Sequence, residues 1–412
     1  MYIESRFRGF AMVTVKEAQN KILDVTKPLS PADVVLAEAT GLVLVEGVKS
    51  PIDLPLFDNS AMDGFAVKEK DIRTASPERP VTLKVVLDLV AGDFSTREIK
   101  NGEAARIMTG APLPPGTDAV VRVEDTDARD EEVAVKIAVS AGKNIRWRGE
   151  DVARESEVLP AAKKLTPGDI GLLAAIGKGS VLVYPRPKVA VISTGDELEE
   201  PGQTLGPGKI YNSNAYMLSS LLAYHGAIPK FLGIARDNPD DLREKLEKAT
   251  VFDLILTSGG VSVGVHDLVK NVLAEMGDIF FWKVAIRPGK PLAFGLLENV
   301  PLLGLPGNPG ASFVSFYQFV LPAIRKLAGR RDALPHTKKA RLEETLKKRK
   351  GFLYCLKVVL SEKKGEITAR LSGGQSSGML LSTSTADALA LLPEDREIFH
   401  PGEEIEVQLL YS

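Results

Sequence analysis

Acidic and basic side chains follow several of the short apolar segments between residues 188 and 305 of this 412-residue chain. The acidic group, Asp196, Glu197, Asp237 and Asp267, can supply the hard oxygen ligands that suit Mg²⁺. The basic group, Lys283, Arg287 and Lys290, can supply positive charge for an anion. Carboxylates and cations at one site suit the cleavage of a phosphoanhydride with the help of a divalent metal.

Glycine-rich turns occur at the same points of the chain. Backbone N–H groups in such turns, and at the helix starts that follow them, bind phosphate groups. Packing alone explains any single turn of this kind, but several such turns meeting at one place favour a binding site. The residues expected to contact a ligand through these turns are Thr194, Gly195, Asp196, Ser258, Gly259, Gly260, Pro306, Gly307, Asn308 and Pro309.

Alternating strands and helices are expected to position these groups. Predicted strands cover residues 188–193, 230–234, 252–257, 292–296 and 301–305. Predicted helices cover residues 215–225, 267–276 and 311–328, and another starts after Asn238 with Pro239 in its first turn. This alternation predicts a doubly wound, mainly parallel sheet. Ligands bind at the carboxyl ends of such strands, so the polar groups are expected at one edge of the sheet.

The whole chain is predicted to be a multidomain protein of α/β and β structure. Residues 1–50 and 145–184 are assigned to an elongated N-terminal domain, whose first helix starts with a Thr14–Glu17 capping box. Residues 51–144 form a β-rich insertion, residues 185–330 the α/β domain and residues 331–412 a C-terminal β-domain. The basic stretch at 338–350 is interpreted as a solvated linker.

Composition excludes several classes of protein. The chain has 52 Lys and Arg against 54 Asp and Glu, so a chain-wide affinity for nucleic acid or an anionic membrane is not expected. Its one cysteine, Cys355, cannot form an internal disulfide or a cysteine-rich metal site. No apolar segment is long enough to span a bilayer. We therefore expect a cytoplasmic protein with no membrane partner.

One motif suggests a different enzyme. Residues 260–264 match the G-x-S-x-G pattern of serine hydrolases, which also need a later Asp and His. His266 is too close in sequence to serve, and His336 and His400 lie outside the α/β segment, so a serine hydrolase is not favoured. Three polar stretches outside that segment, at 57–64, 106–112 and 144–151, are interpreted from their residues alone as tight turns.

Those stretches and the α/β turns carry a family resemblance that covers essentially the whole chain. In order, the sequence contains FDNSAMDG, RIMTGAP, NIR-x-RGED, STGDEL, GIARDNP, TSGGVSVG-x-x-D, FWKVAIRPGKP, GLPGNP and QSSGML. It thereby resembles the molybdopterin molybdenumtransferase family, which includes the C-terminal domain of gephyrin. The adenylyltransferase that makes the activated substrate is similar in the α/β segment alone, so the other motifs argue against it. A gephyrin-like scaffold is not favoured, because no clustering linker is present.

The resemblance implies a four-domain subunit, and a homodimer with its active site at the subunit junction. Adenylylated molybdopterin would bind there with Mg²⁺ and molybdate, its phosphoanhydride would be cleaved, the metal would enter the dithiolene and AMP would leave. The adenylyltransferase and molybdoenzymes become candidate partners. The catalytic positions carried over are Asp63, Thr109, Asp151, Glu197, Asp237 and Asp267, the last three as Mg²⁺ ligands. Asp63, Thr109 and Asp151 would come from another domain, that of the dimer partner.

The resemblance also implies a set of residues that bind the oxyanion, namely Lys283, Arg287, Lys290, Lys357 and Ser377. The sequence departs from the family pattern at two of these positions and at the residue before Ser377. Residue 287 is Arg where Lys is expected, residue 357 is Lys where Arg is expected, and Ser376 stands where Gly is expected. Arg and Lys present different donor geometries, so both molybdate and tungstate are retained as candidate substrates.

Overall fold

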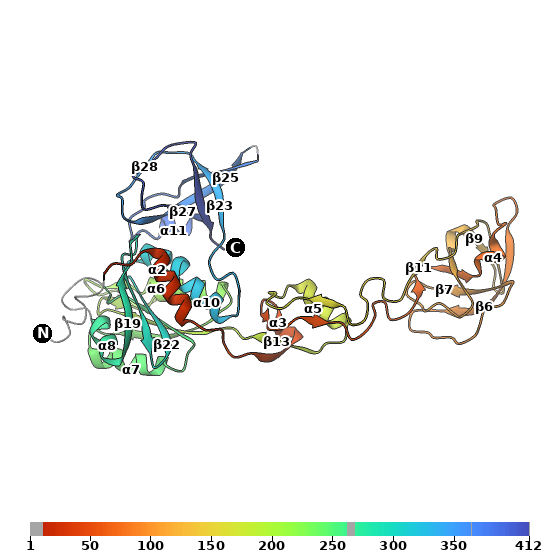
Figure 1. The fold of residues 1–412 in the computed structure, drawn as a ribbon, viewed down its shortest axis with the longest axis horizontal. Coiled ribbons are helices and arrows are strands. Elements are labelled where there is room, and N and C mark those ends of the chain that lie inside the picture. Colours follow the sequence, from red (N-terminus) through yellow and green to blue (C-terminus); the bar gives the residue numbers. More distant parts are fainter. Residues whose placement is uncertain (1–10, 262–267, 364, 412) are drawn as a thin grey trace. The chain divides into compact units, whose positions relative to one another are not determined.

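The computed structural model describes residues 11–261, 268–363 and 365–411 (Figure 1). These residues divide into two compact units. Unit 1 takes the described residues of Met1–Asp33, Gly41–Val45 and Leu182–Ser412, and unit 2 consists of Val34–Thr40 and Glu46–Val181. No helix in the described part of the chain is long and apolar enough to cross a membrane.

The sheet of unit 1 has six strands. Their order is β17 (Ile228–Ala235), β14 (Lys188–Thr194), β18 (Leu254–Ser258), β22 (Val300–Leu305), β21 (Pro291–Leu297) and β19 (Gly277–Lys283). The first four pair in parallel, whereas β21 runs antiparallel to both β22 and β19. Because β21 is antiparallel to both neighbours, β19 runs in the same direction as the four parallel strands. Its carboxyl end therefore lies at the same edge of the sheet as theirs. This confirms the predicted mainly parallel α/β fold.

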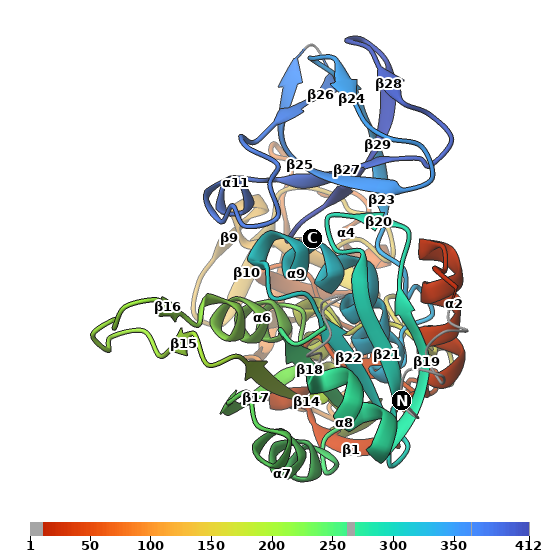
Figure 2. The same cartoon turned by 90° about the vertical axis from the view of Figure 1, so that its left-hand side faces the viewer.

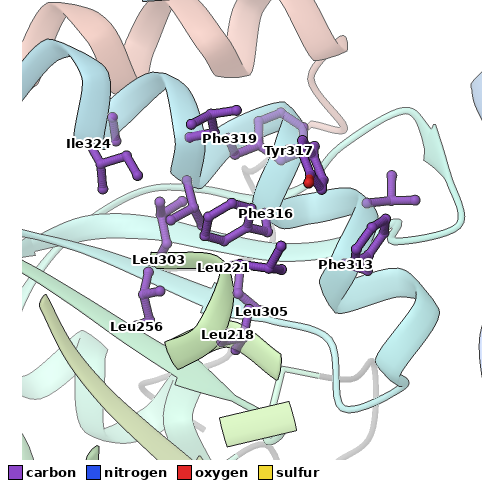
Figure 3. Close-up of a cluster of buried hydrophobic side chains, with 14 of the residues drawn as sticks. Leu218, Leu221, Leu256, Leu303, Leu305, Phe313, Phe316, Tyr317, Phe319 and Ile324 are labelled. Atoms are coloured by element: carbon purple, nitrogen blue, oxygen red, sulfur yellow. The ribbon is translucent and has the colours of Figure 1, made fainter. Parts of the chain in front are cut away.

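Helices cover both faces of this sheet (Figure 2). Val189 and Val191 of β14 face α2 (Val15–Val25), α6 (Ser213–Tyr224), α9 (Pro309–Ser315) and α10 (Leu321–Leu327). Ala190 and Ile192 of the same strand face α7 (Pro239–Ala249) and α8 (Leu268–Met276). Alternate residues of a strand point to opposite faces, which explains why these strands are apolar throughout. Figure 3 shows the larger of the two cores, in which Leu303 packs among side chains of α6 and of the helical segment 309–327.

The helix expected at 311–328 contains an unexpected turn. A π-helical segment at Phe316–Val320 joins α9 to α10, and all five of its side chains are buried. A π turn widens the backbone spiral by one residue and so changes which side chains face the sheet. Helix periodicity in the sequence did not indicate this turn.

Helix α2 packs within unit 1, although the sequence grouped it with residues up to 50. Its start is as predicted, because the Glu17 N–H donates to Thr14 Oγ1 at 3.2 Å and the Thr14 N–H donates to Glu17 Oε2 at 2.7 Å. Ile22 is fully buried in the larger core, and Gln19 Nε2 donates to the Gln318 carbonyl at 3.1 Å. The apolar face of α2 therefore finds its partner far along the chain.

Unit 2 is built on a second six-stranded sheet. Its order is β8 (Ala119–Arg122), β5 (Gly64–Val67), β7 (Glu103–Ile107), β6 (Val81–Leu89), β10 (Glu132–Val135) and β9 (Thr126–Ala128), with α4 (Glu69–Ile72) and the 3₁₀ turn η1 (Val123–Asp125) between strands. Shorter pairs are β4 (Asn59–Ser60) with β11 (Ile145–Arg146), and β3 (Val48–Lys49) with β12 (Glu157–Leu159). The structure thus confirms a β-rich region. Helix α3 covers Leu36–Ala39, and α5 (Pro167–Ala175) begins at the predicted cap, Thr166. A separate three-stranded sheet contains β1 (Ala32–Val35), β13 (Ser180–Tyr184) and β2 (Val43–Leu44), and the residues of β2 are counted in unit 1.

The C-terminal strands of unit 1 close into a β-barrel. The order is β25 (Leu353–Lys363), β26 (Glu366–Leu371), β23 (Thr337–Leu342), β29 (Glu404–Leu409) and β27 (Ala388–Leu392), and β25 also pairs with β27. Strand β20 (Ile286–Arg287), from the α/β part, pairs in parallel with β25. A short pair, β24 (Leu346–Lys347) with β28 (Ile398–Phe399), and helix α11 (Leu381–Ser384) complete this part.

The basic stretch at 338–350 is not the linker that the sequence suggested. Residues 337–342 are strand β23, in which Ala340 and Leu342 are buried in the barrel core while the basic side chains of Lys338, Lys339 and Arg341 remain exposed. Lys339 pairs with Glu404 at 2.5 Å, and Arg341 pairs with Glu366 at 3.2 Å. The charges concealed the strand because apolar residues occupy only one of its faces.

Candidate functional site

A cavity of about 850 Å³ opens at the carboxyl edge of the unit 1 sheet. Turns that follow β14, β18 and β22 line it, together with the loop between β20 and β21 and one loop of the barrel. The predicted site residues that line it are Thr194, Gly195, Glu197, Asp237, Ser258, Gly259, Gly260, Arg287, Lys290, Pro306, Gly307, Asn308, Pro309 and Ser377. The structure therefore gathers most of the predicted groups of unit 1, while their chemical roles stay predictions.

The carboxylates and cations in the cavity keep their charges accessible. Glu197, Asp237 and Arg287 are exposed, and Lys290 is half-buried. In the described part of the chain, no three acidic, His or Cys side chains come together as a metal cluster. Asp267, the third predicted ligand, lies outside the described residues, as does Ser262 of the G-x-S-x-G pattern. The described residues therefore offer two carboxylates and two cations to a ligand.

Among the described residues of unit 1, three predicted site residues are absent from the lining of the cavity. Asp196 contacts a lining residue instead, since its carboxylate accepts the Asp237 N–H at 3.0 Å. Lys283, at the end of β19, uses its carbonyl to accept the Val13 N–H at 3.1 Å. Lys357, 1% exposed, is the third. Asp196 and Lys357 thus contact the residues that carry the site, and the sequence pattern could not separate such groups from those that reach the cavity.

Buried Lys357 holds the barrel loop that carries Ser377 into the cavity. Its Nζ donates to Ser382 Oγ at 2.8 Å and to the Met379 carbonyl at 3.3 Å. Its backbone N–H donates to Gln375 Oε1 at 2.9 Å, and its carbonyl accepts from Gln375 Nε2 at 3.0 Å. Burial lowers the pKa of the Lys357 ammonium, because water no longer solvates the charge. The structure thus gives Lys357 a role in loop position that the resemblance did not imply.

The glycine turns differ in one respect from the expected phosphate cradle. The Gly195 N–H donates to the Ala235 carbonyl and the Gly259 N–H to the Leu305 carbonyl, both at 3.1 Å. At Gly259, where φ is +96°, a Cβ would lie 2.7 Å from the Thr194 carbonyl oxygen, so no larger side chain fits. These two N–H groups donate to protein carbonyls and not to a ligand. The two glycines therefore allow the ends of neighbouring strands to approach closely.

Two asparagines of the cavity wall are not indicated by the sequence motifs. Asn214 Nδ2 donates to Ser258 Oγ at 2.8 Å and to the Gly307 carbonyl at 2.7 Å, which links two of the predicted turns. Asn212 accepts the Ser193 hydroxyl at 2.9 Å and caps α6. The available signal was an Asn three residues before Ala215, the residue at which the helix was expected to start.

Unit 2 brings the three polar stretches outside the α/β segment together. Asp63 accepts hydrogen bonds from the N–H and the Oγ1 of Thr109, both at 2.7 Å. Ser60 pairs with Ile145, and its N–H donates to the Ala111 carbonyl at 3.0 Å. The hydrogen bond from the Thr109 backbone holds the pKa of Asp63 below its usual range. The stretches are therefore more than separate turns, because they form one hydrogen-bonded cluster.

Asp151 belongs to the last of these stretches. Its N–H donates to the Leu54 carbonyl at 3.0 Å, and its side chain is exposed. Nearby, Arg148 Nε donates to Asp53 at 2.6 Å, and the Arg148 N–H donates to Asp58 at 2.8 Å. Asp63, Thr109 and Asp151 thus all lie in unit 2, whereas the cavity belongs to unit 1.

Comparison with known proteins covers nearly the whole chain. Residues 13–177 match the MoeA N-terminal region (domain I and II), residues 190–326 a probable molybdopterin binding domain, and residues 339–410 the MoeA C-terminal region (domain IV). The chain is 38% identical over 403 residues to molybdopterin molybdenumtransferase 2 of Mycobacterium tuberculosis, which covers 96% of this chain and 99% of that protein. It is 37% identical over 408 residues to the molybdopterin molybdenumtransferase of Nostoc sp., with 96% and 93% covered.

A solved structure agrees with the sequence matches. The crystal structure of the molybdopterin biosynthesis MoeA protein of Pyrococcus horikoshii superposes on this chain with a TM-score of 0.82 and 32% identity. That superposition covers 98% of this chain and all of the other. Since relatives above 30% identity align over almost the full length, the chain belongs to the molybdopterin molybdenumtransferase family.

Proposed function

We propose that this chain is a molybdopterin molybdenumtransferase, which cleaves the phosphoanhydride of adenylylated molybdopterin, inserts the metal of an oxyanion into the dithiolene and releases AMP. The observation that carries the proposal is one cavity at the sheet edge, lined by Glu197, Asp237, Arg287 and Lys290. The names of the full-length relatives supply the pterin and the molybdenum. We also propose that the enzyme is cytoplasmic, since its single buried cysteine gives the fold no disulfide that would need an oxidising compartment.

The donor set of the cavity fits a bound Mg²⁺. Mg²⁺ is commonly held by one or two carboxylates, with substrate phosphates and water completing its octahedral shell. Glu197 and Asp237 are two such carboxylates at the cavity wall, so they would hold the ion, with Asp267 proposed as a third ligand. When bound, Mg²⁺ would neutralise negative charge on the phosphates of the substrate.

The chain's own residues would divide the remaining tasks. Arg287 and Lys290 attract the oxyanion, because they place two positive charges at the cavity wall. Asn214 links the turns after β18 and β22 through its two hydrogen bonds. It thereby fixes the surface against which the pterin or the diphosphate would rest. Asp196 fixes the backbone of Asp237. The protein's contribution is thus charge held in a fixed geometry.

Purified protein should release AMP from adenylylated molybdopterin in the presence of Mg²⁺ and molybdate. A parallel assay with equal concentrations of molybdate and tungstate should measure which metal enters the pterin, by mass spectrometry of the product. Transfer of AMP from ATP to molybdopterin, without metal insertion, would instead support the adenylyltransferase and overturn the proposal.

We also propose that the enzyme is a homodimer in which unit 2 of one subunit completes the cavity of the other. Three of the predicted catalytic residues lie in unit 2, which does not contain the cavity. A homodimer with two-fold symmetry would supply them twice, once to each site.

Mixing two inactive variants tests this arrangement. Asp63→Asn and Glu197→Gln subunits are each expected to be inactive alone. In a mixed dimer one site would carry both substitutions and the other neither, so random mixing should restore about a quarter of wild-type AMP release. Glu197→Gln mixed with Asp237→Asn is the matched control and should restore nothing, since both substitutions lie in unit 1. Failure of the first mixture to recover, with subunit exchange verified, would show that the site is not shared.

A further inference from the structure

The two cations of the cavity share one aromatic ring. The guanidinium carbon of Arg287 lies 5.0 Å from the ring centre of Phe352, and the ammonium of Lys290 lies 6.0 Å from it. Phe352 is half-buried. Neither the sequence motifs nor the proposed function assigns it a role. Both distances fall within the range at which a cation is attracted to the face of an aromatic ring.

Backbone pairing brings the ring to the cations. Strand β20, which contains Arg287, pairs with the start of β25, and the Leu353 N–H donates to the Ala285 carbonyl at 2.9 Å. The turn that carries Phe352 is fixed from the other side, because Lys348 Nζ donates to the Phe352 carbonyl at 3.1 Å. The position of the ring is therefore set by the fold and not by the cations alone.

The ring of Phe352 offsets the repulsion between the positive charges of Arg287 and Lys290. Two like charges on the same side of a cavity repel each other, and within the described residues neither has a carboxylate at salt-bridge distance. The negative face of an aromatic ring attracts both charges without neutralising them, as a carboxylate would. Both cations thus remain available to an anion in the cavity.

We infer that Phe352 is a positioning residue that orients Arg287 and Lys290 toward the oxyanion. This inference rests on the proposed function, because it concerns the same cavity. It also explains why Arg at position 287 suits this chain: a planar guanidinium stacks on an aromatic face better than an ammonium does. The affinity of the site for its oxyanion then depends on a side chain that is not among the lining residues of the cavity.

Replacing Phe352 by leucine removes the ring and keeps an apolar side chain. The expected result is a molybdate affinity about 2- to 5-fold weaker, which is the range of one exposed cation–π interaction. Isothermal titration calorimetry of the full chain with molybdate measures this, and AMP release should show the same change in the KM for molybdate with kcat little altered. Phe352→Tyr should retain wild-type affinity, because its ring is kept. Phe94→Leu, the same change at a side chain 79% exposed in unit 2, is the matched control.

A double-mutant cycle with Arg287→Lys separates positioning from general packing. If the ring acts through Arg287, then Arg287→Lys should weaken molybdate binding less in the Phe352→Leu chain than in the wild type. Additive effects, or an unchanged affinity in Phe352→Leu, would overturn the inference. A wild-type chain that binds molybdate but releases no AMP would overturn the proposed function, while the calorimetric comparison would still decide the role of Phe352. A wild-type chain that binds no molybdate would overturn both.

Discussion

Replacing Asp237 by asparagine should lower the rate of AMP release by about 10²- to 10³-fold, the usual loss when one preorganised electrostatic group is removed from an active site. Asparagine keeps the size of the side chain and removes its negative charge. Asp237 lies at the cavity wall after β17, and the carboxylate of Asp196 fixes its backbone. The substitution should therefore weaken Mg²⁺ binding without moving the loop. Single-turnover release of AMP, measured as a function of Mg²⁺ concentration, should show the loss.

Glu197→Gln should behave in the same way, because Glu197 is the second carboxylate of the cavity. Asp240→Asn is the matched control, since Asp240 lies three residues from Asp237 and its side chain is 86% exposed in an ion pair with Arg243. Exposed ion pairs of this kind contribute little to stability, so the control should retain wild-type rates. Wild-type rates in both Asp237→Asn and Glu197→Gln would rule out the assignment of these two carboxylates.

Leu303→Ala should reduce the free energy of unfolding of the α/β part by about 2–5 kcal/mol, through lost apolar contact and the cavity left behind. Leu303 is fully buried in β22, a strand with a partner on each side, and it packs among the side chains shown in Figure 3. Its strand runs directly into the turn that starts at Pro306 and lines the functional cavity. Loss of packing here should therefore also loosen the site.

Urea unfolding followed by tryptophan fluorescence can isolate this effect. The chain has two tryptophans, Trp147 in unit 2 and buried Trp282 in β19 of the sheet. In a Trp147→Phe background, Trp282 alone reports on the α/β part. Leu381→Ala, the same change at a side chain 80% exposed in unit 1, is the control and should change the unfolding midpoint very little. Equal losses in the two variants would contradict the burial of Leu303 as the cause.

Local chemistry made part of the structure predictable. The capping box at Thr14 and the caps at Thr166 and Asn238 are short-range signals, and each helix starts where its cap indicates. The alternation of strands and helices was enough to predict the α/β fold. The rule that ligands bind at the carboxyl ends of parallel strands predicted that Glu197 and Arg287 would lie at one site, and both line the cavity. These features depend on residues a few positions apart or on a general property of parallel sheets.

Features that depend on distant pairing were not predictable in the same way. The basic residues around Lys339 concealed a strand, because a strand with one solvated face shows apolar residues only at alternate positions. The sequence could not tell that Lys357 is buried, since its burial follows from the loop that folds over it. Asn214 was missed because an asparagine at the start of a helix has an ordinary structural explanation. The π turn at Phe316–Val320 left no recognisable pattern.

The position of α2 has a consequence for the synthesis of the protein on the ribosome. Gln19 and Gln318, which hydrogen-bond to each other, are 299 residues apart in the sequence. At about 5–20 residues per second, α2 leaves the ribosome roughly 15 to 60 seconds before the helices against which it packs. All of unit 2 is synthesised during that interval and can bury its own cores first. Throughout that time the apolar face of α2, with Ile22 at its centre, lacks the helices against which it packs in the folded protein.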